Sequence, residues 1–251
     1  MSRIDVRVRT AVLCAVNTLL PVAHTGRPRA DPSAVLDRMT LLLWSGGPWH
    51  TLGAGYTTVF QTFTKWTAAG VFERAYANVL RLERRPLKRN VRVECIDSSY
   101  VKSIYGRDCI GRNPTDHGRN ATKVSAIVAS DGVPVALAFF PGNTSDQRTV
   151  EVTLCARLAP RAAPRMPMYP DKGYNSAANR ALLRRYGYVD CISARGRRTH
   201  RVVNRRRNVV ERTFSWVDKS RRLLLQYDQK VSAYIAWTYL ACLRMVGARL
   251  L

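Results

Sequence analysis

The sequence predicts a protein in two parts, a small all-α domain with a basic linker at residues 1–90 and an α/β domain at residues 91–251. Apolar residues recur with a helical period before residue 90, and short extended segments alternate with helices after it. Hydrophobic residues make up 46% of the chain, enough for a buried core and too many for a disordered tail. The formal net charge of +24 makes the chain repel itself unless a polyanion shares its surface. Nucleic acid is therefore the default partner.

Four helices are expected in the first part. An amphipathic helix ends at Pro21, a second covers 33–43 with Ser33 as its cap, a third starts at Thr57, and a fourth covers 71–84. The third helix places its apolar residues at i, i+4 and i+7, facing a core, and its polar face carries Thr58, Gln61, Thr62 and Lys65. These helices resemble a helix-turn-helix unit whose polar face contacts DNA. A purely structural helical bundle is the alternative.

In the second part the period changes from helical to extended. A strand over 92–97 is followed by strands over 123–130 and 133–140, which Asp131-Gly132 joins as a hairpin. After them we expect a helix that begins at Ser145 or Asp146 and ends near 158, a strand over 166–169, a helix over 176–186, a strand over 188–193, and helices over 206–225 and 229–249. This order is that of a ribonuclease-H-like domain, although periodicity alone leaves other α/β folds open.

Cysteine usage and the chain ends narrow the class of protein further. Six cysteines show no C-x-x-C pair and no His at ligand spacing, so we expect buried thiols in a reducing compartment rather than a zinc site. The uncharged stretch 10–23 after three arginines imitates a secretory signal, but Asp5 and Asn17 interrupt the pattern. Residues 231–243 are too few to cross a bilayer and are expected to form a buried helix.

Each acidic residue in so basic a chain needs a reason to be present. Structural roles in turns, caps and the helical domain account for Asp31, Asp37, Asp131 and Asp146. Three acids lack such a role: Asp97 and Asp171 at the ends of predicted strands, and Glu211 in a helix among arginines. Turning that helix by 100° per residue predicts a sheet-facing stripe at Val210, Phe214, Val217, Arg221 and Leu224, and an adjoining edge at Arg207, Glu211, Asp218 and Arg222. Ligands of open sheets bind at the carboxyl ends of strands, where these acids would meet.

Three carboxylates that converge in a basic protein are suited to hold two Mg²⁺ ions beside a phosphodiester. The alternative is that Asp97 and Asp171 are ordinary strand-end residues and that Glu211 belongs to a surface ion-pair network. Nearby, a dense arginine run without counter-charge covers Arg195, Arg197, Arg198, Arg201, Arg205, Arg206 and Arg207. We expect this run to follow the DNA backbone, with a solvated loop as the alternative.

Three segments resemble the sequence blocks of DDE transposases of bacterial insertion sequences, in particular the insertion-sequence-five group. They are Cys95-Ile96-Asp97-Ser98-Ser99-Tyr100-Val101-Lys102, Asp171-Lys172-Gly173-Tyr174-Asn175-Ser176, and residues 206–216, which read RRNVVERTFSW. The N-terminal segments 26–31, 46–49, 63–66 and 70–74 resemble that group's DNA-binding region, and Gly142-Asn143-Thr144-Ser145-Asp146 resembles its loop after the hairpin. Along the last helix the family's outer Tyr and Lys places hold Asn204 and Asp218 here, a departure that leaves the three acids in place.

The resemblance implies a ribonuclease-H-like catalytic domain that cleaves at the terminal inverted repeats of a mobile element and joins its ends to target DNA. It maps the catalytic, metal-binding acids onto Asp97, Asp171 and Glu211, with two Mg²⁺ ions that Mn²⁺ can replace. The expected partners are double-stranded DNA and, in the complex of paired ends, further copies of the chain, with no membrane. Beside the arginine run, Lys172 and Arg212 are expected to contact DNA.

Two rivals remain at this level. One is a catalytically inactive or domesticated DNA-binding protein derived from a transposase, which the presence of all three acids disfavours. The other is a nuclease for RNA:DNA hybrids, which the N-terminal helices disfavour. The expected location is the cytoplasm beside the nucleoid in a bacterium, or the nucleus in a eukaryotic host.

Overall fold

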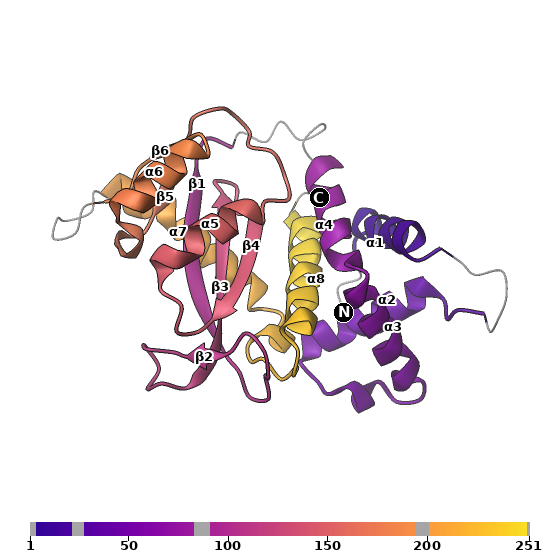
Figure 1. Ribbon diagram of the computed structural model, residues 1–251. Coiled ribbons are helices and arrows are strands. Elements are labelled where there is room, and N and C mark those ends of the chain that lie inside the picture. The colour runs from indigo at the N-terminus through magenta and orange to yellow at the C-terminus, as the bar shows by residue number, and fades with distance from the viewer. Residues whose placement is uncertain (1–3, 22–27, 83–90, 194–200, 250–251) are drawn as a thin grey trace. The chain divides into compact units, whose positions relative to one another are not determined.

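The computed structural model describes residues 4–21, 28–82, 91–193 and 201–249 (Figure 1). The chain forms two compact units. The helical unit comprises Met1–Glu83, Tyr105–Asp108 and Val217–Leu251, and the sheet unit comprises Arg84–Ile104 and Cys109–Trp216. This division differs from the predicted one, which placed every residue after 90 in the α/β domain.

The helical unit contains both N-terminal and C-terminal helices. These are α1 (Val6–Leu19), α2 (Pro32–Ser45), the 3-10 helix η1 (Trp49–Leu52), α3 (Tyr56–Ala68), α4 (Val71–Leu82), the 3-10 helix η3 (Arg221–Leu223) and α8 (Val231–Arg249). The four helices predicted before residue 90 are confirmed. The cap of α2 is Asp31 rather than the predicted Ser33, because the Asp31 carboxylate accepts hydrogen bonds from the backbone N–H groups of Ser33 and Ala34.

Helix α8 is apolar on most of its surface, and helices α1 to α4 of the helical unit cover it. Its Trp237 is fully buried and stacks on Phe63 of α3, with ring centroids 4.3 Å apart. Its Tyr239 lies 5.9 Å from the ring of Tyr76 in α4. The window Val231–Ala248 has the length and hydropathy of a membrane span, but 67% of it is buried inside the protein, as is usual for a core helix. The N-terminal helices thus complete their core with a C-terminal segment.

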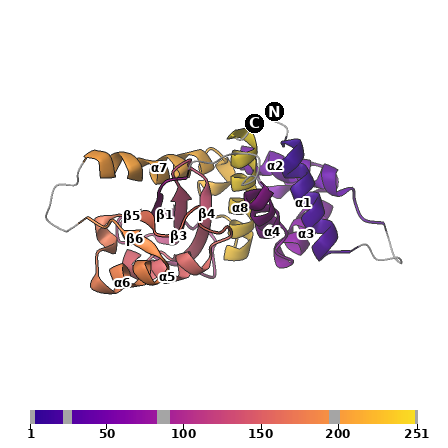
Figure 2. The same ribbon diagram turned by 90° about the horizontal axis from the view of Figure 1, so that it is seen from above.

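The sheet unit is built on six strands with helices on both faces. The strands are β1 (Glu94–Lys102), β2 (Gly111–Arg112), β3 (Asn120–Ala129), β4 (Pro134–Pro141), β5 (Met166–Pro170) and β6 (Tyr188–Asp190). The helices are α5 (Asp146–Cys155), the 3-10 helix η2 (Lys172–Tyr174), α6 (Ala177–Arg185) and α7 (Arg201–Val217). Figure 2 shows α7 on one face of the sheet, with α5 and α6 on the other.

The strand directions place the unit in the expected fold class. β3 is antiparallel to both β1 and β4, whereas β5 is parallel to β1 and β6 is parallel to β5. The order β2-β3-β1-β5-β6, with β4 also on β3, is the arrangement of a ribonuclease-H-like domain. The predicted α/β fold with preceding helices is therefore confirmed. The hairpin is also as predicted: Gly132 has a φ of 82°, and the Asp131 carboxylate accepts a bond from the Val133 N–H.

Several element bounds differ from the prediction: β3 begins at Asn120 rather than 123, α5 ends at Cys155 rather than near 158, β6 ends at Asp190 rather than 193, and α7 begins at Arg201 rather than 206. The differences in β1 and at the end of α7 affect the predicted site. β1 continues past 97 to Lys102, because all nine of its residues pair with β3, from Glu94 opposite Ala129 onward. α7 ends at Val217 rather than near 225. Directly after it, the Ser220 N–H donates to the Val217 carbonyl and closes a turn. Residues 218–224 therefore do not continue the predicted helical stripe and edge, and Leu224 is 54% exposed.

The cysteines are all free, but they are not all buried as predicted. Cys95 and Cys242 are buried, Cys109 and Cys191 are half-buried, and Cys14 and Cys155 are exposed. Cys14 is exposed because the buried face of α1 passes through Val12, Ala15 and Val16 instead.

Candidate active site

Asp97 and Asp171 are placed side by side by the register of two parallel strands. The last paired residues of β1 and β5 are Ile96 and Pro170, and each aspartate is the next residue along the chain. Neighbouring strands are about 4.8 Å apart, so the two side chains emerge close together. Asp171 follows the end of β5 as predicted. Asp97 does not end β1; it follows the end of the pairing between β1 and β5.

Helix α7 supplies a positive group to this pair of acids. The Arg207 guanidinium contacts both carboxylates, with Nη1 at 2.9 Å from Asp171 Oδ1 and Nη2 at 3.6 Å from Asp97 Oδ2. Glu211 is four residues later on α7, about one helical turn, and is exposed. The structure therefore joins two of the predicted acids through Arg207 and places the third on the helix that carries Arg207.

The two aspartates differ in their surroundings. The Asp97 side chain is 26% exposed and that of Asp171 is 43% exposed. Burial raises the pKa of Asp97 to about 6, and the nearby negative charges of Asp171 and Asp146 act in the same direction. The Ser98 N–H, 2.8 Å from Asp97 Oδ1, and the Arg207 guanidinium act in the opposite direction on this pKa. Burial therefore favours the protonated form of Asp97, whereas the Ser98 N–H and the Arg207 guanidinium favour its ionised form.

The predicted metal site is only partly assembled in the described residues. Among them, no three Asp, Glu, His or Cys side chains are close enough together to hold a metal ion. The donor chemistry of the aspartate pair nevertheless suits a divalent cation, because two carboxylates already share one positive group and Mg²⁺ prefers carboxylate oxygen. Glu211 is the remaining predicted ligand, and it lies one turn of α7 after Arg207.

Sequence reasoning missed a set of hydrogen-bonded side chains beside the pair. Asp146 does not cap α5 as expected; its Oδ1 accepts bonds from Ser98 Oγ at 2.7 Å and from Lys123 Nζ at 2.9 Å. Lys123 is 1% exposed, in a strand whose other residues from Ala121 to Ala129 are also buried. A single lysine in an otherwise uncharged, buried strand requires a polar partner. This lysine was the feature of the sequence that could have indicated the hydrogen-bonded set.

Four of the residues predicted to contact DNA in the sheet unit have described side chains: Lys172, Arg206, Arg207 and Arg212. Lys172 follows Asp171 in η2. The Arg206 guanidinium lies 5.1 Å from the centre of the Tyr169 ring, and that of Arg212 lies 5.1 Å from the Trp216 ring. The predicted contacts Arg197 and Arg198 lie outside the described residues. Arg201 and Arg205 are in α7, and their side chains, like that of Asn204, also lie outside the description.

The four predicted residues of the helical unit share a solvent-facing side of α3. Thr58, Gln61 and Lys65 are exposed and Thr62 is half-buried, whereas Val59, Phe63 and Trp66 are buried. The predicted orientation of the helix is therefore confirmed. Contact with DNA remains a prediction.

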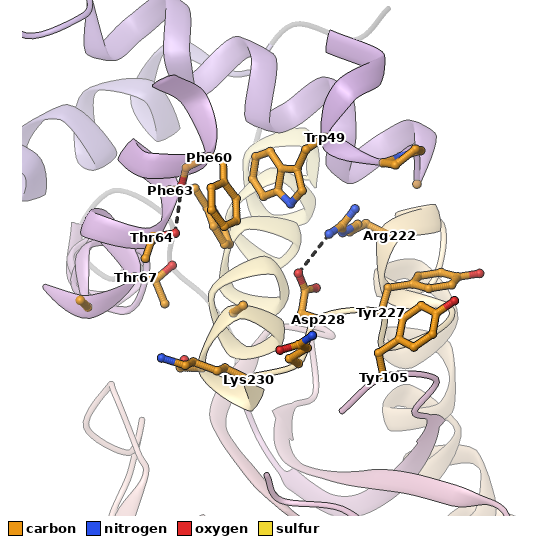
Figure 3. A pocket seen from close by; sticks show the side chains of 16 residues that line it. Trp49, Phe60, Phe63, Thr64, Thr67, Tyr105, Arg222, Tyr227, Asp228 and Lys230 are labelled. Atoms are coloured by element: carbon orange, nitrogen blue, oxygen red, sulfur yellow. Dashed lines mark hydrogen bonds and ion pairs between the residues drawn. The ribbon is translucent and has the colours of Figure 1, made fainter. Parts of the chain in front are cut away.

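The helical unit also contains a pocket that the sequence did not predict. It has a volume of about 960 Å³, and Figure 3 shows Trp49, Phe60 and Phe63 along one side of it. Arg222 donates to the Gly47 carbonyl and pairs with Asp228 at 3.0 Å at the edge of this pocket. The pocket is mostly apolar and holds none of the three predicted acids, so it is distinct from the candidate active site.

Comparison with known proteins agrees with the geometry. The family described as transposase DDE domain matches residues 92–246. A Burkholderia cepacia protein, whose name assigns it to insertion sequence element IS402 as a putative transposase, is 30% identical over 145 residues, covering 55% of this chain and 68% of that protein.

Two solved structures of Mos1 transposase also show similarity. A paired-end complex with the left transposon end aligns with 96% of this chain and 69% of its own, at 12% identity and a TM-score of 0.31. A pre-cleavage transpososome aligns with 92% of this chain and 80% of its own, at 11% identity and the same TM-score. The family match covers more than half of the sequence and includes Asp97, Asp171 and Glu211, and on this ground the chain belongs to the transposase DDE domain family.

Proposed function

We propose that this transposase cleaves DNA at the terminal inverted repeats of a mobile element and then joins the exposed 3′-hydroxyl groups to target DNA. The observation that carries the proposal is that Asp97 in β1 and Asp171 directly after the parallel strand β5 both contact Arg207 of α7, the helix that bears Glu211. The family implies use of a divalent metal ion, and the three carboxylates are the residues that would hold it. Mg²⁺ is the proposed ion, with Mn²⁺ as a substitute.

Two ions bound by these acids would activate the attacking oxygen and stabilise the leaving oxygen of a phosphodiester. The chain itself supplies the negative ligands and, close to them, positive groups for phosphate. Arg207 and Lys172 lie next to the acids, and Arg206 and Arg212 lie on the same helix as Glu211. These side chains would hold the DNA backbone, while the acids would bind metal and contribute little to affinity for DNA.

The element's two ends must be held together for coordinated cleavage and joining, and we propose that a homodimer or a higher oligomer does so. The proposed cellular location follows that of the DNA, beside the nucleoid in a bacterium or in the nucleus of a eukaryotic host.

The test of this function is a nicking assay with three substrates. They are a duplex that carries the inverted repeat from DNA flanking the gene, a scrambled duplex, and an RNA:DNA hybrid. We expect Mg²⁺-dependent nicks at the repeat end, followed by joining to a target plasmid. Preferential cleavage of the hybrid would favour the nuclease, and tight binding to the repeat without any cleavage would favour the inactive DNA-binding protein.

The polar face of α3 is expected to distinguish the element end from other DNA. In the full chain, Gln61→Ala should reduce discrimination between repeat and scrambled duplex by about 1–3 kcal/mol, because it removes a base-reading amide. Lys65→Ala should weaken binding to both duplexes alike, as removal of a phosphate-binding group does. Fluorescence anisotropy measures both effects. The full chain is required because α8 completes the core of the helical unit.

Thr64→Ala is the matched control on α3, since Thr64 faces the pocket in Figure 3. Equal affinity of the wild-type chain for repeat and scrambled duplex would remove the role of this face in recognition.

The arginine run before Glu211 is expected to bind phosphates without reading sequence. Changing Arg197, Arg198 and Arg201 together to Ala should weaken binding to every duplex and flatten the salt dependence of log K by about 0.9 for each phosphate that is no longer neutralised. Affinities measured over a series of salt concentrations give this slope. An unchanged slope with unchanged affinity would identify the run as a solvated loop.

A further inference from the structure

Asp146 connects the two segments that carry Asp97 and Asp171. Its Oδ1 accepts the 2.7 Å hydrogen bond from Ser98, the residue after Asp97. The same Ser98 hydroxyl accepts a bond of 3.2 Å from the Tyr174 hydroxyl, and Tyr174 is in η2, three residues after Asp171. A chain of three side chains thus runs from α5 through β1 to the turn after β5.

A close backbone approach strengthens this connection. A Cβ atom on Gly173 would lie 3.2 Å from Asp146 Oδ2, tighter than ordinary van der Waals contact. The turn that follows Asp171 therefore packs directly on the Asp146 carboxylate, and glycine allows it to do so. Asp146 Oδ1 thus bonds to the segment of Asp97, and Oδ2 faces the turn that follows Asp171 with little room for a side chain at Gly173.

Lys123 fixes the carboxylate in this place. Its ammonium group is buried, pairs with Asp146 Oδ1 at 2.9 Å, donates to the Thr144 carbonyl, and lies 4.8 Å from the centre of the Tyr100 ring. A buried ammonium without a carboxylate is costly, so the pair holds Asp146 against β3. Asp146 is consequently anchored to the sheet, and its other contacts reach the segments that carry both aspartates.

We propose that Asp146 is a positioning residue for catalysis: anchored by Lys123, it holds the Asp97 and Asp171 segments, through Ser98 and the Gly173 turn, at the separation that a divalent cation requires. This inference rests on the proposed function of the two aspartates as metal ligands. Removal of groups that orient metal ligands from behind commonly costs about 10- to 100-fold in metal affinity or activity. Asp146 itself does not contact the metal in this proposal.

The test compares metal affinity in folded full-length variants. Ser98→Ala removes the link without disturbing any charge. Because Asp146→Asn alone leaves Lys123 buried without its partner, the second variant combines Asp146→Asn with Lys123→Met. Free Mn²⁺, followed by electron paramagnetic resonance during titration, reports metal binding independently of cleavage. The Mg²⁺ concentration for half-maximal nicking is the second readout.

We expect both variants to bind DNA as the wild type does, and to need about 10- to 100-fold more Mn²⁺ and Mg²⁺. Ser145→Ala is the matched control, since Ser145 is adjacent to Asp146, is exposed and makes no side-chain capping bond. Unchanged metal affinity in both variants would overturn the positioning role. The Asp97→Asn variant distinguishes a failure of the positioning role from a failure of the proposed function. If Asp97→Asn also leaves Mn²⁺ binding unchanged, the aspartates are not metal ligands, and the proposed function fails as well.

Discussion

Nicking of element-end DNA is expected to fall about a thousandfold when Asp97, Asp171 or Glu211 is replaced by its amide. Each substitution removes one proposed negative ligand and leaves the side chain's shape, so the metal ion would be misplaced at a cost of about 4 kcal/mol in transition-state stabilisation. Binding of DNA should be retained or become tighter, because a negative charge near the scissile phosphate is removed. A structural acid would behave differently, with loss of folding and of binding together.

The measurement is Mg²⁺- or Mn²⁺-dependent nicking by Asp97→Asn, Asp171→Asn and Glu211→Gln, each confirmed as folded by circular dichroism. Asp218→Asn is the matched control, because Asp218 follows the end of α7 and so does not lie on the helical edge that was predicted to hold it beside Glu211. A folded variant that cleaves at the wild-type rate would exclude its residue from the site. If Glu211→Gln were active and Asp218→Asn inactive, the third role would pass to Asp218.

The sheet unit is expected to lose about 3–5 kcal/mol of unfolding free energy when Arg157 is changed to Met. Glu94 in β1 is 1% exposed and accepts bonds of 2.6 and 2.7 Å from the Arg157 guanidinium and of 2.8 Å from the Tyr188 hydroxyl. Without Arg157, the buried Glu94 carboxylate keeps only the neutral Tyr188 hydroxyl among these three hydrogen bonds. The cost arises from that unpaired charge rather than from the absence of the two hydrogen bonds as such.

Amide hydrogen exchange of β1 residues reports on this unit separately from the helical one. Replacing both partners, Glu94→Leu with Arg157→Met, should recover most of the stability, because no buried charge remains. Arg119→Met provides the exposed comparison: it breaks an ion pair with Asp116 at the surface and should cost at most about 1 kcal/mol. Equal losses of stability in Arg157→Met and Arg119→Met would contradict the role of the buried network.

The local elements of the fold were predictable where sequence signals are local. Asp131-Gly132 determines its hairpin, and the spacing of Val59, Phe63 and Trp66 determines the buried face of α3. The full length of β1 was not predictable, because Ser98-Ser99-Tyr100 shows no alternation of apolar and polar residues. That stretch is a strand because β3 pairs with it. The membership of α8 in the helical unit was also missed, since a helix that is apolar on most sides gives no direction for its packing.

The site shows the same limit. Asp97, Asp171 and Glu211 could be selected from sequence because each lacked a local structural role. Asp146 was missed because an acid at the start of a helix is usually a cap, and its partners Ser98 and Lys123 are 48 and 23 residues away. Such long-range contacts become visible only once the hairpin and β1 are assembled.

Whether the three acids hold the metal ions is measured most directly by anomalous diffraction from Mn²⁺ in crystals of the full chain bound to element-end DNA. We predict ions held by Asp97, Asp171 and Glu211 beside the scissile phosphate, with the Arg207 guanidinium displaced from the two aspartates. Ions bound elsewhere in a complex that still cleaves its DNA, with Arg207 retained between Asp97 and Asp171, would contradict the proposed catalytic site.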